Sequence, residues 1–460
     1  MTSTITDNGF YLGRFWDVER GRAREHVFAP VENESNTLLI GPPGSGKTNL
    51  LISNTALMHR PMMLFDMKGE ISAVVAPMLK RKRHADIRVI NPWNVQEEAR
   101  PYLADSGWNP LRDTFPQNPD YGDDITNLTI AINASHGQGG QNSFFTDGAT
   151  IAGACVLEDL RSGDANANLA MFRDIICEPY GIDRNGDPIG LLKRFVRLTK
   201  SGSSSVRAKA GRFATGTKSS QETIASLTLE TGCLDSGPLR RSLHGPGIDW
   251  QRFKNSASVV SVIIPADKLN SHKSYSRMLV TTAVRELMRS PPSKEVPGVA
   301  LMLDEFPQLG FLGELISAAA TARGFGVRLM PIVVQDLSQL RAVYGGDRWE
   351  TFITTANCIC SYAPRSNFTA EYLSNLCGDK IIGVTTRGTS INGKGEGSVN
   401  TNTNYQYRKL FEPSELMRMP RGRMLCLLNG MLPFFTQVPN YWEASFASQL
   451  AANPYHPGGR

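Results

Sequence analysis

An octet near the start of the chain has the residue types and the spacing of a loop that holds nucleotide phosphates. It fits the pattern Gly-x-x-x-x-Gly-Lys-Ser/Thr, and its residues are Gly41, Pro42, Pro43, Gly44, Ser45, Gly46, Lys47 and Thr48. Glycine lets the backbone approach phosphate oxygens closely enough for successive N–H groups to point at them. The octet therefore predicts binding of a nucleoside triphosphate and favours it over a glycine-rich loop without a ligand.

The last two residues of the octet have distinct expected roles. The Lys47 ammonium would reach the β- and γ-phosphates, and the Thr48 hydroxyl would hold Mg²⁺. Apolar residues at 37–40 predict a buried strand before the loop, and those at 50–58 predict a helix after it. This order places the positive N-terminal end of a helix at the phosphates, which strengthens the prediction.

An acidic motif later in the chain would complete the site. The apolar run 299–303 predicts a strand, and Asp304 and Glu305 follow it directly. Because ligands of open α/β sheets bind at the carboxyl ends of the strands, Asp304 would face Mg²⁺ and Glu305 would polarise the attacking water. Two solvated acids at a strand end are the alternative, which the phosphate loop makes less favoured. We therefore expect Lys47 to face both acids across adjoining strands.

Three other polar residues lie at the ends of a neighbouring strand-like run, 328–334. Gln335 follows this run and is either a sensor of the γ-phosphate or a capping residue. Arg323 and Arg328 lie before or at its start. An arginine offered to the nucleotide of a neighbouring subunit would stabilise charge in the transition state, and a surface or ion-paired role is the alternative.

The apolar run 62–65 ends in a similar way. Asp66 and Lys68 follow it, close in the expected fold to the phosphate loop. Either residue would touch the nucleotide or support the residues that do. A purely structural role remains open for both.

The composition indicates a globular protein with more than one folding unit. The chain has 460 residues, of which 41% are hydrophobic, and its net charge of +6 is compatible with a polyanionic partner. The seven cysteines show no Cys-x-x-Cys pair, so we expect reduced thiols in a cytosolic protein. No uncharged apolar stretch approaches the about 18–20 residues that span a membrane, which predicts a soluble chain.

The succession of apolar runs predicts a doubly wound α/β core with a mostly parallel sheet. Helical patterns at 70–79, 274–288 and 313–322 separate several of the strand-like runs, as in βαβ units. Most runs are apolar on both faces, as strands covered by helices must be. The expected strands are 37–40, 62–65, 87–90, 259–264, 299–303, 328–334, 358–362 and 424–428.

Strand-like runs disappear between residues 113 and 252. This segment instead has helical spacing at 126–134, 146–160, 169–176, 191–196 and 221–229. We interpret 113–252 as an all-α domain inserted into a nucleotide-binding domain made of residues 1–112 and 253–460. A second change of composition is at 385–404, where Gly, Ser, Thr and Asn dominate, and there we expect a mobile loop that either lines a channel or lies on the surface.

Several motifs together resemble those of the type IV secretion coupling proteins, the TraG/TraD-like conjugation ATPases. The strings Asp-Glu-Phe-Pro and Gln-Asp-Leu-Ser-Gln-Leu are far more specific than a phosphate loop. Besides the octet, the matching segments are 65–70, 91–92, 108–111, 303–310, 334–340, 344–345, 356–358, 369–374 and 410–416. The resemblance covers nearly the whole predicted nucleotide-binding domain.

The resemblance implies a RecA-like P-loop NTPase with an inserted all-α domain, assembled as a hexameric ring with ATP and Mg²⁺ between subunits. It implies that Asp304 and Glu305 complete hydrolysis, that Gln335 senses the γ-phosphate, and that Arg323 is the better trans-arginine candidate. By the same analogy, ATP hydrolysis would move relaxase-bound DNA, or protein substrates, into a type IV secretion channel. The all-α domain would then meet the relaxosome or the cargo.

One feature departs from that family. Its members usually begin with two membrane-spanning helices, whereas here the phosphate loop begins at residue 41 with no such helix before it. Either the chain is a truncated piece, or it is a soluble variant that borrows its anchor from another protein. We expect it at the cytoplasmic face of the bacterial inner membrane.

Two other functions stay open at this stage. In the first, the chain is a receptor that recruits relaxase or effector proteins, with ATP acting mainly as an assembly ligand. Alternatively, it would be a chromosomal DNA translocase of the FtsK/HerA-like lineage, since one fold serves many functions.

Overall fold

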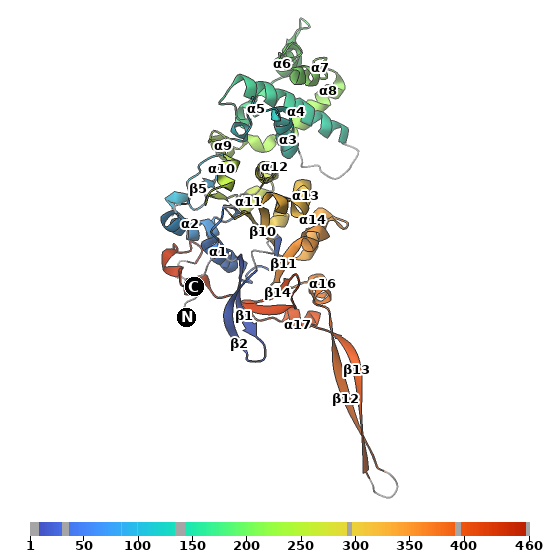
Figure 1. Cartoon of the computed structure of the whole chain (residues 1–460). Helices are drawn as coiled ribbons and strands as arrows, with labels where there is room; N and C mark the ends of the chain where they lie inside the picture. The colour runs from blue at the N-terminus through green and yellow to red at the C-terminus, as the bar shows by residue number, and fades with distance from the viewer. Residues whose placement is uncertain are drawn as a thin grey trace.

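The computed structural model describes residues 9–29, 36–83, 85–98, 100–133, 143–291, 297–391 and 397–456. Its centre is an 11-stranded sheet in the order β2-β1-β15-β14-β11-β3-β10-β9-β4-β8-β5 (Figure 1). The strands are β1 (Phe10–Asp17), β2 (Arg22–Ala29), β3 (Asn36–Ile40), β4 (Met62–Phe65), β5 (Ile87–Ile90), β8 (Val259–Val262), β9 (Val299–Leu303), β10 (Val327–Val334), β11 (Ala356–Ser361), β14 (Arg423–Leu428) and β15 (Phe434–Gln437).

The part of the sheet from β11 to β5 is parallel throughout, and β14, β15, β1 and β2 extend it with antiparallel strands. The predicted α/β class with a mostly parallel sheet is therefore confirmed. All the predicted strands are present, with ends that differ by at most two residues. The sequence prediction missed β1, β2 and β15, because polar or charged residues interrupt their apolar runs.

Helices cover both faces of the sheet because its strands are apolar on both faces. On one face α1 (Lys47–Leu57) and α2 (Glu70–Arg83) pack with Leu39, Leu64 and Met302. On the other face α12 (Lys273–Leu287) and α13 (Gly313–Thr321) pack with their neighbours along the strands, Leu38, Met63 and Leu301. Shorter helices complete the layers: α10 (Trp250–Lys254), α11 (Ala266–Leu269), α14 (Leu337–Tyr344), α15 (Thr351–Thr354), α16 (Asn367–Cys377) and α17 (Pro413–Met417).

The chain between β5 and β8 forms a separate helical part at one end of the molecule (Figure 1). Its helices are α3 (Tyr121–Asn133), α4 (Ser143–Gly163), α5 (Leu169–Ile176), α6 (Gly190–Leu198), α7 (Ser204–Gly211), α8 (Lys218–Glu230) and α9 (Gly237–Ser242). Each predicted helix corresponds to one of them where its residues are described. A small strand pair, β6 (Tyr180–Ile182) with β7 (Pro188–Ile189), interrupts the helices. The domain boundaries at 112 and 252 stay a prediction.

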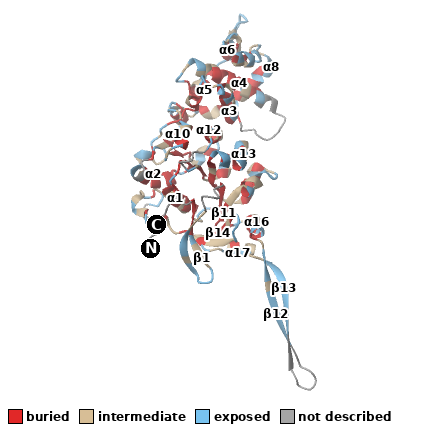
Figure 2. Cartoon of the chain, in the orientation of Figure 1, coloured by how far each residue is buried: buried red, intermediate tan, exposed pale blue. Residues whose placement is uncertain are grey.

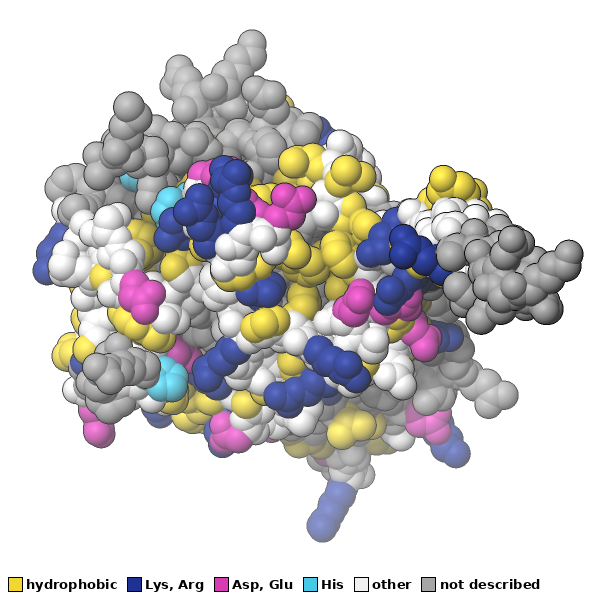
Figure 3. All heavy atoms as spheres, turned by 90° about the horizontal axis from the view of Figure 1, so that it is seen from below, with side chains coloured by type: hydrophobic (Ala, Val, Ile, Leu, Met, Phe, Trp, Pro, Cys, Tyr) yellow, Lys and Arg dark blue, Asp and Glu magenta, His cyan; other side chains and the backbone are white. Residues whose placement is uncertain are grey.

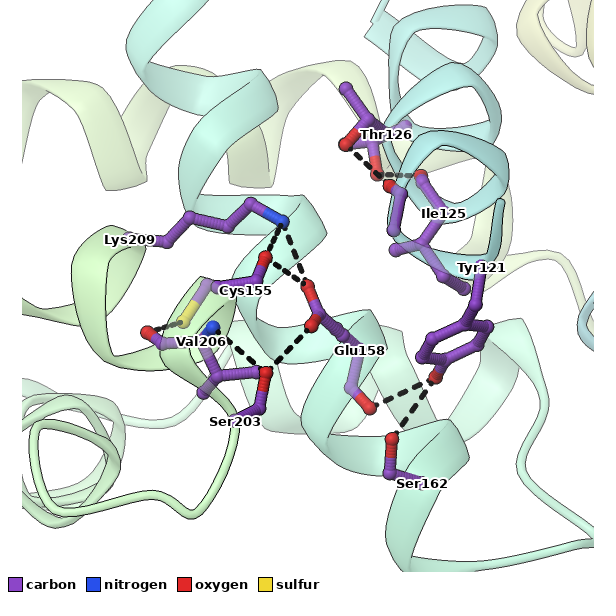
Figure 4. A network of polar contacts seen from close by, with 12 residues as sticks. Tyr121, Ile125, Thr126, Cys155, Glu158, Ser162, Ser203, Val206 and Lys209 are labelled. Atoms are coloured by element: carbon purple, nitrogen blue, oxygen red, sulfur yellow. Dashed lines mark hydrogen bonds and ion pairs between the residues drawn. The ribbon is translucent and has the colours of Figure 1, made fainter. Parts of the chain in front are cut away.

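A buried carboxylate joins two helices of this part (Figure 4). The Glu158 side chain on α4 is only 4% exposed and lies 2.7 Å from the Lys209 ammonium on α7. The hydroxyl groups of Ser203 and Ser205 also donate to Glu158, each at 3.1 Å. Because the charge is both paired and hydrogen-bonded, its burial is tolerated, and α4 and α7 are fixed against each other.

The prediction of a loop at 385–404 is wrong for the residues described there. Strands β12 (Asp379–Ile391) and β13 (Gly397–Lys409) form a two-stranded antiparallel ribbon. The ribbon projects from the end opposite the helical part, and its described residues are largely exposed (Figures 1 and 2). Composition misled here because cross-strand backbone hydrogen bonds order a polar segment without burying it. Residues 392–396 lie outside the described part.

Two further observations concern membrane spans and cysteines. Among the described residues, no helix combines the length and the apolar character that a bilayer crossing requires. None of the seven cysteines, all of which lie in the described part, takes part in a disulfide, and their redox state stays a prediction.

Candidate nucleotide-binding site

The phosphate-loop octet connects the end of β3 to the start of α1. The Gly41 N–H donates to the Val334 carbonyl oxygen on β10 at 3.0 Å, which anchors the loop at the edge of the sheet. Gly44 and Gly46 have φ angles of 76° and 108°, a backbone region that residues with a side chain rarely adopt. A Cβ atom on Gly41 would lie 2.7 Å from Ser45 Oγ and 3.0 Å from the Tyr362 ring, so a larger residue here would displace its neighbours.

The loop presents donors that suit a polyphosphate. The Lys47 ammonium donates to the carbonyl oxygens of Gly41 at 2.5 Å and Pro42 at 3.2 Å, so it lies inside the curve of the loop. Ser45 Oγ is buried and has no hydrogen-bond partner among the described residues. No side chain caps the N-terminus of α1, which leaves backbone N–H groups of its first turn for an anion. These residues fit the phosphates of a nucleotide.

A cavity of about 1040 Å³ brings together most of the predicted site residues. Pro43, Gly44, Ser45, Gly46, Lys47, Thr48, Asp66, Lys68, Asp304, Glu305 and Gln335 line it. The expectation of adjoining strands is wrong in one detail, because β10 lies between β3 and β9. The carboxyl ends of all three parallel strands share one sheet edge, so the side chains still converge.

Burial and neighbouring charges shift the titration of the charged groups in the cavity. Burial lowers the pKa of the Lys47 ammonium, which is 8% exposed, while the Glu305 and Asp304 carboxylates oppose this effect. Burial, together with the charges of Glu305 and Asp66, raises the pKa of Asp304 to about 7. A desolvated carboxyl next to two others favours a proton or a cation, which suits the predicted role in holding Mg²⁺.

Glu305 and Gln335 contact each other directly. The Gln335 Nε2 group donates to Glu305 Oε2 at 2.7 Å. Glu305 has a φ angle of 49°, which is uncommon for a residue other than glycine. This backbone conformation, directly after β9, turns the acid toward Gln335 at the end of β10. Residues held in such conformations cluster at functional sites.

Asp66 and Lys68 form one flank of the cavity. Asp66 is 1% exposed and accepts hydrogen bonds from the Ser72 N–H at 2.8 Å and the Ser72 hydroxyl at 2.9 Å. Burial raises the pKa of Asp66 to about 6, against the effect of these two donors. Lys68 is exposed at the cavity wall. Asp66 thus has structural partners, whereas Lys68 lines the cavity from its exposed side.

Arg323 does not lie in this cavity. It is exposed on the short 3₁₀ turn Ala322–Phe325, which directly precedes β10. Gln335 follows the other end of the same strand, roughly 25 Å away for eight residues of extended chain. Arg323 therefore cannot reach the nucleotide site of its own chain, which leaves a second subunit's site or a surface role.

Sequence reasoning missed the residues that form the rest of the wall. The fully buried Tyr362, directly after β11, donates from its hydroxyl to the Gly46 carbonyl oxygen at 3.3 Å. Asn49, the residue after the octet, accepts from the Tyr441 N–H at 2.7 Å and donates to the Pro439 carbonyl at 2.8 Å. The octet itself gave no signal that residues nearly 400 positions away would contact it.

The C-terminal segment closes another side of the cavity. The Asn453 side chain, 3% exposed, donates to Glu70 at 2.8 Å and to the Tyr441 hydroxyl at 3.2 Å. The Tyr455 hydroxyl donates to the Lys68 carbonyl oxygen at 2.8 Å. These bonds connect the wall near α1 to the flank formed after β4. The other wall residues are Arg14, Ala23, Ile52, Met67, Ile71, Ala266, Gln308, Arg421, Gly422, Gln437, Val438, Asn440, Trp442, Glu443 and His456.

The site consists of β3, the phosphate loop and α1, together with two acids that follow β9, which lies two strands from β3 in the sheet. This arrangement defines a RecA-like P-loop NTPase. Over residues 2–456 the chain matches the family described as type IV secretory system conjugative DNA transfer. The chain belongs to this family. Among curated proteins, no sequence matches significantly.

Solved structures show the same fold at low sequence identity. The unbound bacterial conjugative coupling protein TrwBdeltaN70 has a TM-score of 0.63 at 15% identity, with 89% of this chain and 87% of that chain covered. TrwB in complex with the non-hydrolysable ATP analogue ADPNP has a TM-score of 0.61 at 14% identity, with 93% of each chain covered. VirB4 of Thermoanaerobacter pseudethanolicus has a TM-score of 0.55 at 14% identity, with 96% and 98% covered.

Proposed function

We propose that the chain is an ATP-hydrolysing coupling protein that drives DNA into a type IV secretion channel during conjugation. The observation that carries the proposal is the single cavity that joins the phosphate loop to Asp304, Glu305 and Gln335. Membership of the conjugative DNA transfer family supports the substrate class. Structures of TrwB with ATP and GTP analogues and with ADP and Mg²⁺ support the cofactors ATP and Mg²⁺.

The residues of the cavity divide the work of hydrolysis. The loop N–H groups and Lys47 would bind the phosphates, and the Thr48 hydroxyl and the Asp304 carboxylate would hold Mg²⁺. The positive charge of bound Mg²⁺ would offset the negative charge of the phosphate oxygens. The Glu305 carboxylate would accept a proton from the attacking water. The Gln335 amide, already bonded to Glu305, would donate to the γ-phosphate and so report its presence.

Arg323 has a proposed role only in an assembly. Its position at the far end of β10 is consistent with contact to a nucleotide bound by the neighbouring subunit of a ring, which we propose to be a hexamer. An arginine supplied in this way stabilises transition-state charge and raises the rate by about 10³–10⁵. Relaxase or effector proteins, channel components and the inner-membrane face complete the proposed partners and location.

The test is ATP hydrolysis measured against protein concentration, with and without DNA. We expect the rate per subunit to rise cooperatively with concentration, because the arginine of one subunit completes the site of the next. DNA should stimulate the rate, and Arg323→Ala should abolish the cooperative rise while ATP binding persists. Arg184→Ala is the control, since Arg184 is an exposed arginine of the helical part and does not line the cavity.

Two outcomes would contradict parts of this proposal. A rate that DNA leaves unchanged at all concentrations would remove the DNA-motor function and favour a receptor that uses ATP for assembly. A rate per subunit that is independent of concentration, with a fully active Arg323→Ala variant, would remove the shared site.

A further inference from the structure

The ribbon formed by β12 and β13 exposes a set of aromatic and apolar side chains outside the globular body. Tyr405, Tyr407 and Ile381 are 77%, 81% and 61% exposed. Apolar side chains normally avoid such positions when nothing covers them, and a two-stranded ribbon alone gains little from them. We therefore expect a partner outside this chain to cover the exposed rings.

Register places these residues on one face. Ile381 pairs with Tyr407, Gly383 with Tyr405, Thr385 with Thr403 and Arg387 with Thr401, and paired residues of antiparallel strands point to the same side. We name this set the tyrosine face. A Cβ atom on Gly383 would lie 3.7 Å from the Tyr405 ring, so the ring packs over the glycine and its outer side faces solvent.

The spacing of the two tyrosines favours unstacked bases. They are two residues apart on one strand, which corresponds to about 6.8 Å. Stacked nucleotides in one strand of a duplex repeat at about 3.4 Å, half of this distance. Two successive bases would therefore contact both rings only when they are separated from each other, as in an extended single strand.

The charge of the ribbon complements a phosphate backbone. Asp379 is the only carboxylate among its described side chains, and Lys409 neutralises it at 3.1 Å. Arg387, on the tyrosine face, and Lys380 have no ion pair among the described residues. Figure 3 views the molecule from this end and shows several Lys and Arg side chains on its surface. The remaining ribbon side chains are mostly Thr, Asn and Gln, which donate and accept hydrogen bonds.

We propose that the tyrosine face of the ribbon binds single-stranded DNA, with bases stacked on Tyr405 and Tyr407 and phosphates near Arg387. The proposal rests on the proposed function, since it assigns one DNA contact of the motor. Aromatic rings beside basic groups are the usual platform for single strands, because every base offers a face for stacking.

A bilayer fits the ribbon less well. A membrane-inserting hairpin needs apolar residues at its tip, whereas the sequence 389–400 contains only Ile391 and Val399 as large apolar residues and is otherwise glycine-rich and polar. A second copy of the chain is also less favoured, because repeated Lys and Arg side chains on like ribbons would repel each other.

The experiment measures the anisotropy of a fluorescein-labelled oligothymidylate with the full chain. Replacing one tyrosine by alanine should raise Kd at least about fivefold, and Tyr405→Ala with Tyr407→Ala should raise it at least about 25-fold. A variant with both Tyr405→Phe and Tyr407→Phe should keep the wild-type affinity for the oligothymidylate, because stacking needs the ring and not the hydroxyl. Affinity for a blunt duplex should change less than about twofold, since its bases are already stacked. Leu432→Ala, an exposed apolar residue outside the ribbon, is the matched control.

Failure of this proposal is separable from failure of the proposed function. The ribbon lies outside the nucleotide cavity, so all ribbon variants should hydrolyse ATP at the wild-type basal rate. Unchanged single-strand affinity in the double alanine variant, or an equal loss for single strands and duplex, would overturn the proposal. Two results for the double alanine variant, each with intact single-strand affinity, would also overturn the proposal. Loss of sedimentation with anionic phosphatidylglycerol vesicles would favour a membrane, and loss of self-association would favour a second copy.

Discussion

The nucleotide cavity and the ribbon hold their functional side chains in opposite ways. In the cavity, side chains are fixed by partners far away in sequence, as Asn453 is by Glu70 and Gln335 by Glu305. In the ribbon, Tyr405 and Tyr407 pair across the strands with Gly383 and Ile381 and are 77% and 81% exposed. The cavity is arranged for chemistry that needs fixed geometry, whereas the ribbon leaves its rings available to a partner. Substitutions in the two regions should therefore differ in what they damage.

The strongest expected effect is on the chemical step in the cavity. Glu305→Gln should lower kcat for ATP hydrolysis by about 10²–10⁴, because the amide cannot accept the proton of the attacking water. ATP binding should persist, since the phosphate loop is unchanged. Steady-state hydrolysis and binding of a fluorescent ATP analogue check both parts. A kcat within tenfold of wild type would show that another group is the base.

A second cavity substitution sharpens the role of the amide. Gln335→Ala removes the donor that lies 2.7 Å from Glu305 and should lower kcat by about 10²-fold, as loss of one polar group facing the transition state does. Gln339→Ala, in the first turn of α14 and outside the cavity, is the control. Equal rates for the two variants would leave Gln335 without a part in hydrolysis, since Asp336 and not Gln335 caps α14.

The stability of the cavity wall depends on one buried amide. Asn453→Ala should lower the free energy of unfolding by about 1–3 kcal/mol, because the Glu70 carboxylate loses its buried donor. Asn440→Ala, whose hydrogen bond to Glu443 is exposed, should cost less than about 0.5 kcal/mol. Urea unfolding measures both. Similar losses of unfolding free energy in the two variants would mean that Asn453 does not stabilise the cavity wall.

The buried acids of the cavity predict a pH dependence of stability. Burial raises the pKa of folded Asp66 to about 6, above its unfolded value, so the folded state favours the protonated form. This stabilisation is complete below about pH 4 and is lost as the pH rises through 6, at about 1 kcal/mol per pH unit. Asp66→Asn keeps an acceptor for Ser72 and should remove this component of the slope. An unchanged slope in urea unfolding between pH 4 and 7 would contradict the assignment.

The smallest effect is expected in the ribbon. Tyr407→Ala should change the free energy of unfolding by less than about 0.5 kcal/mol, since the side chain is 81% exposed. Tyr362→Ala, whose ring is buried against the phosphate loop, is the opposite case and should cost about 3–5 kcal/mol. Similar losses of unfolding free energy in Tyr407→Ala and Tyr362→Ala would contradict the proposed difference between the ribbon and the cavity.

The parts of the molecule that local patterns specify were predictable from the sequence. The parallel strands, the phosphate loop and the acids after β9 follow from apolar runs and motif spacing. The walls of the cavity were not, because Asn49 meets Pro439 and Tyr441 only through tertiary packing that leaves no periodic pattern. The ribbon was missed for a different reason, since its strands pair with each other without a buried face. The order β3-β10-β9 likewise depends on sheet topology, which strand sequences alone do not specify.

The central claim is that one cavity, with Lys47 opposite Asp304 and Glu305, hydrolyses ATP. Its most direct test compares ATP turnover by the wild-type chain and by Lys47→Ala, with Mg²⁺ and DNA present and at protein concentrations that permit assembly. The account predicts steady hydrolysis by the wild type and a rate at least about 10²-fold lower for the variant. Equal rates for the two proteins, or a wild type without turnover under all of these conditions, would contradict it.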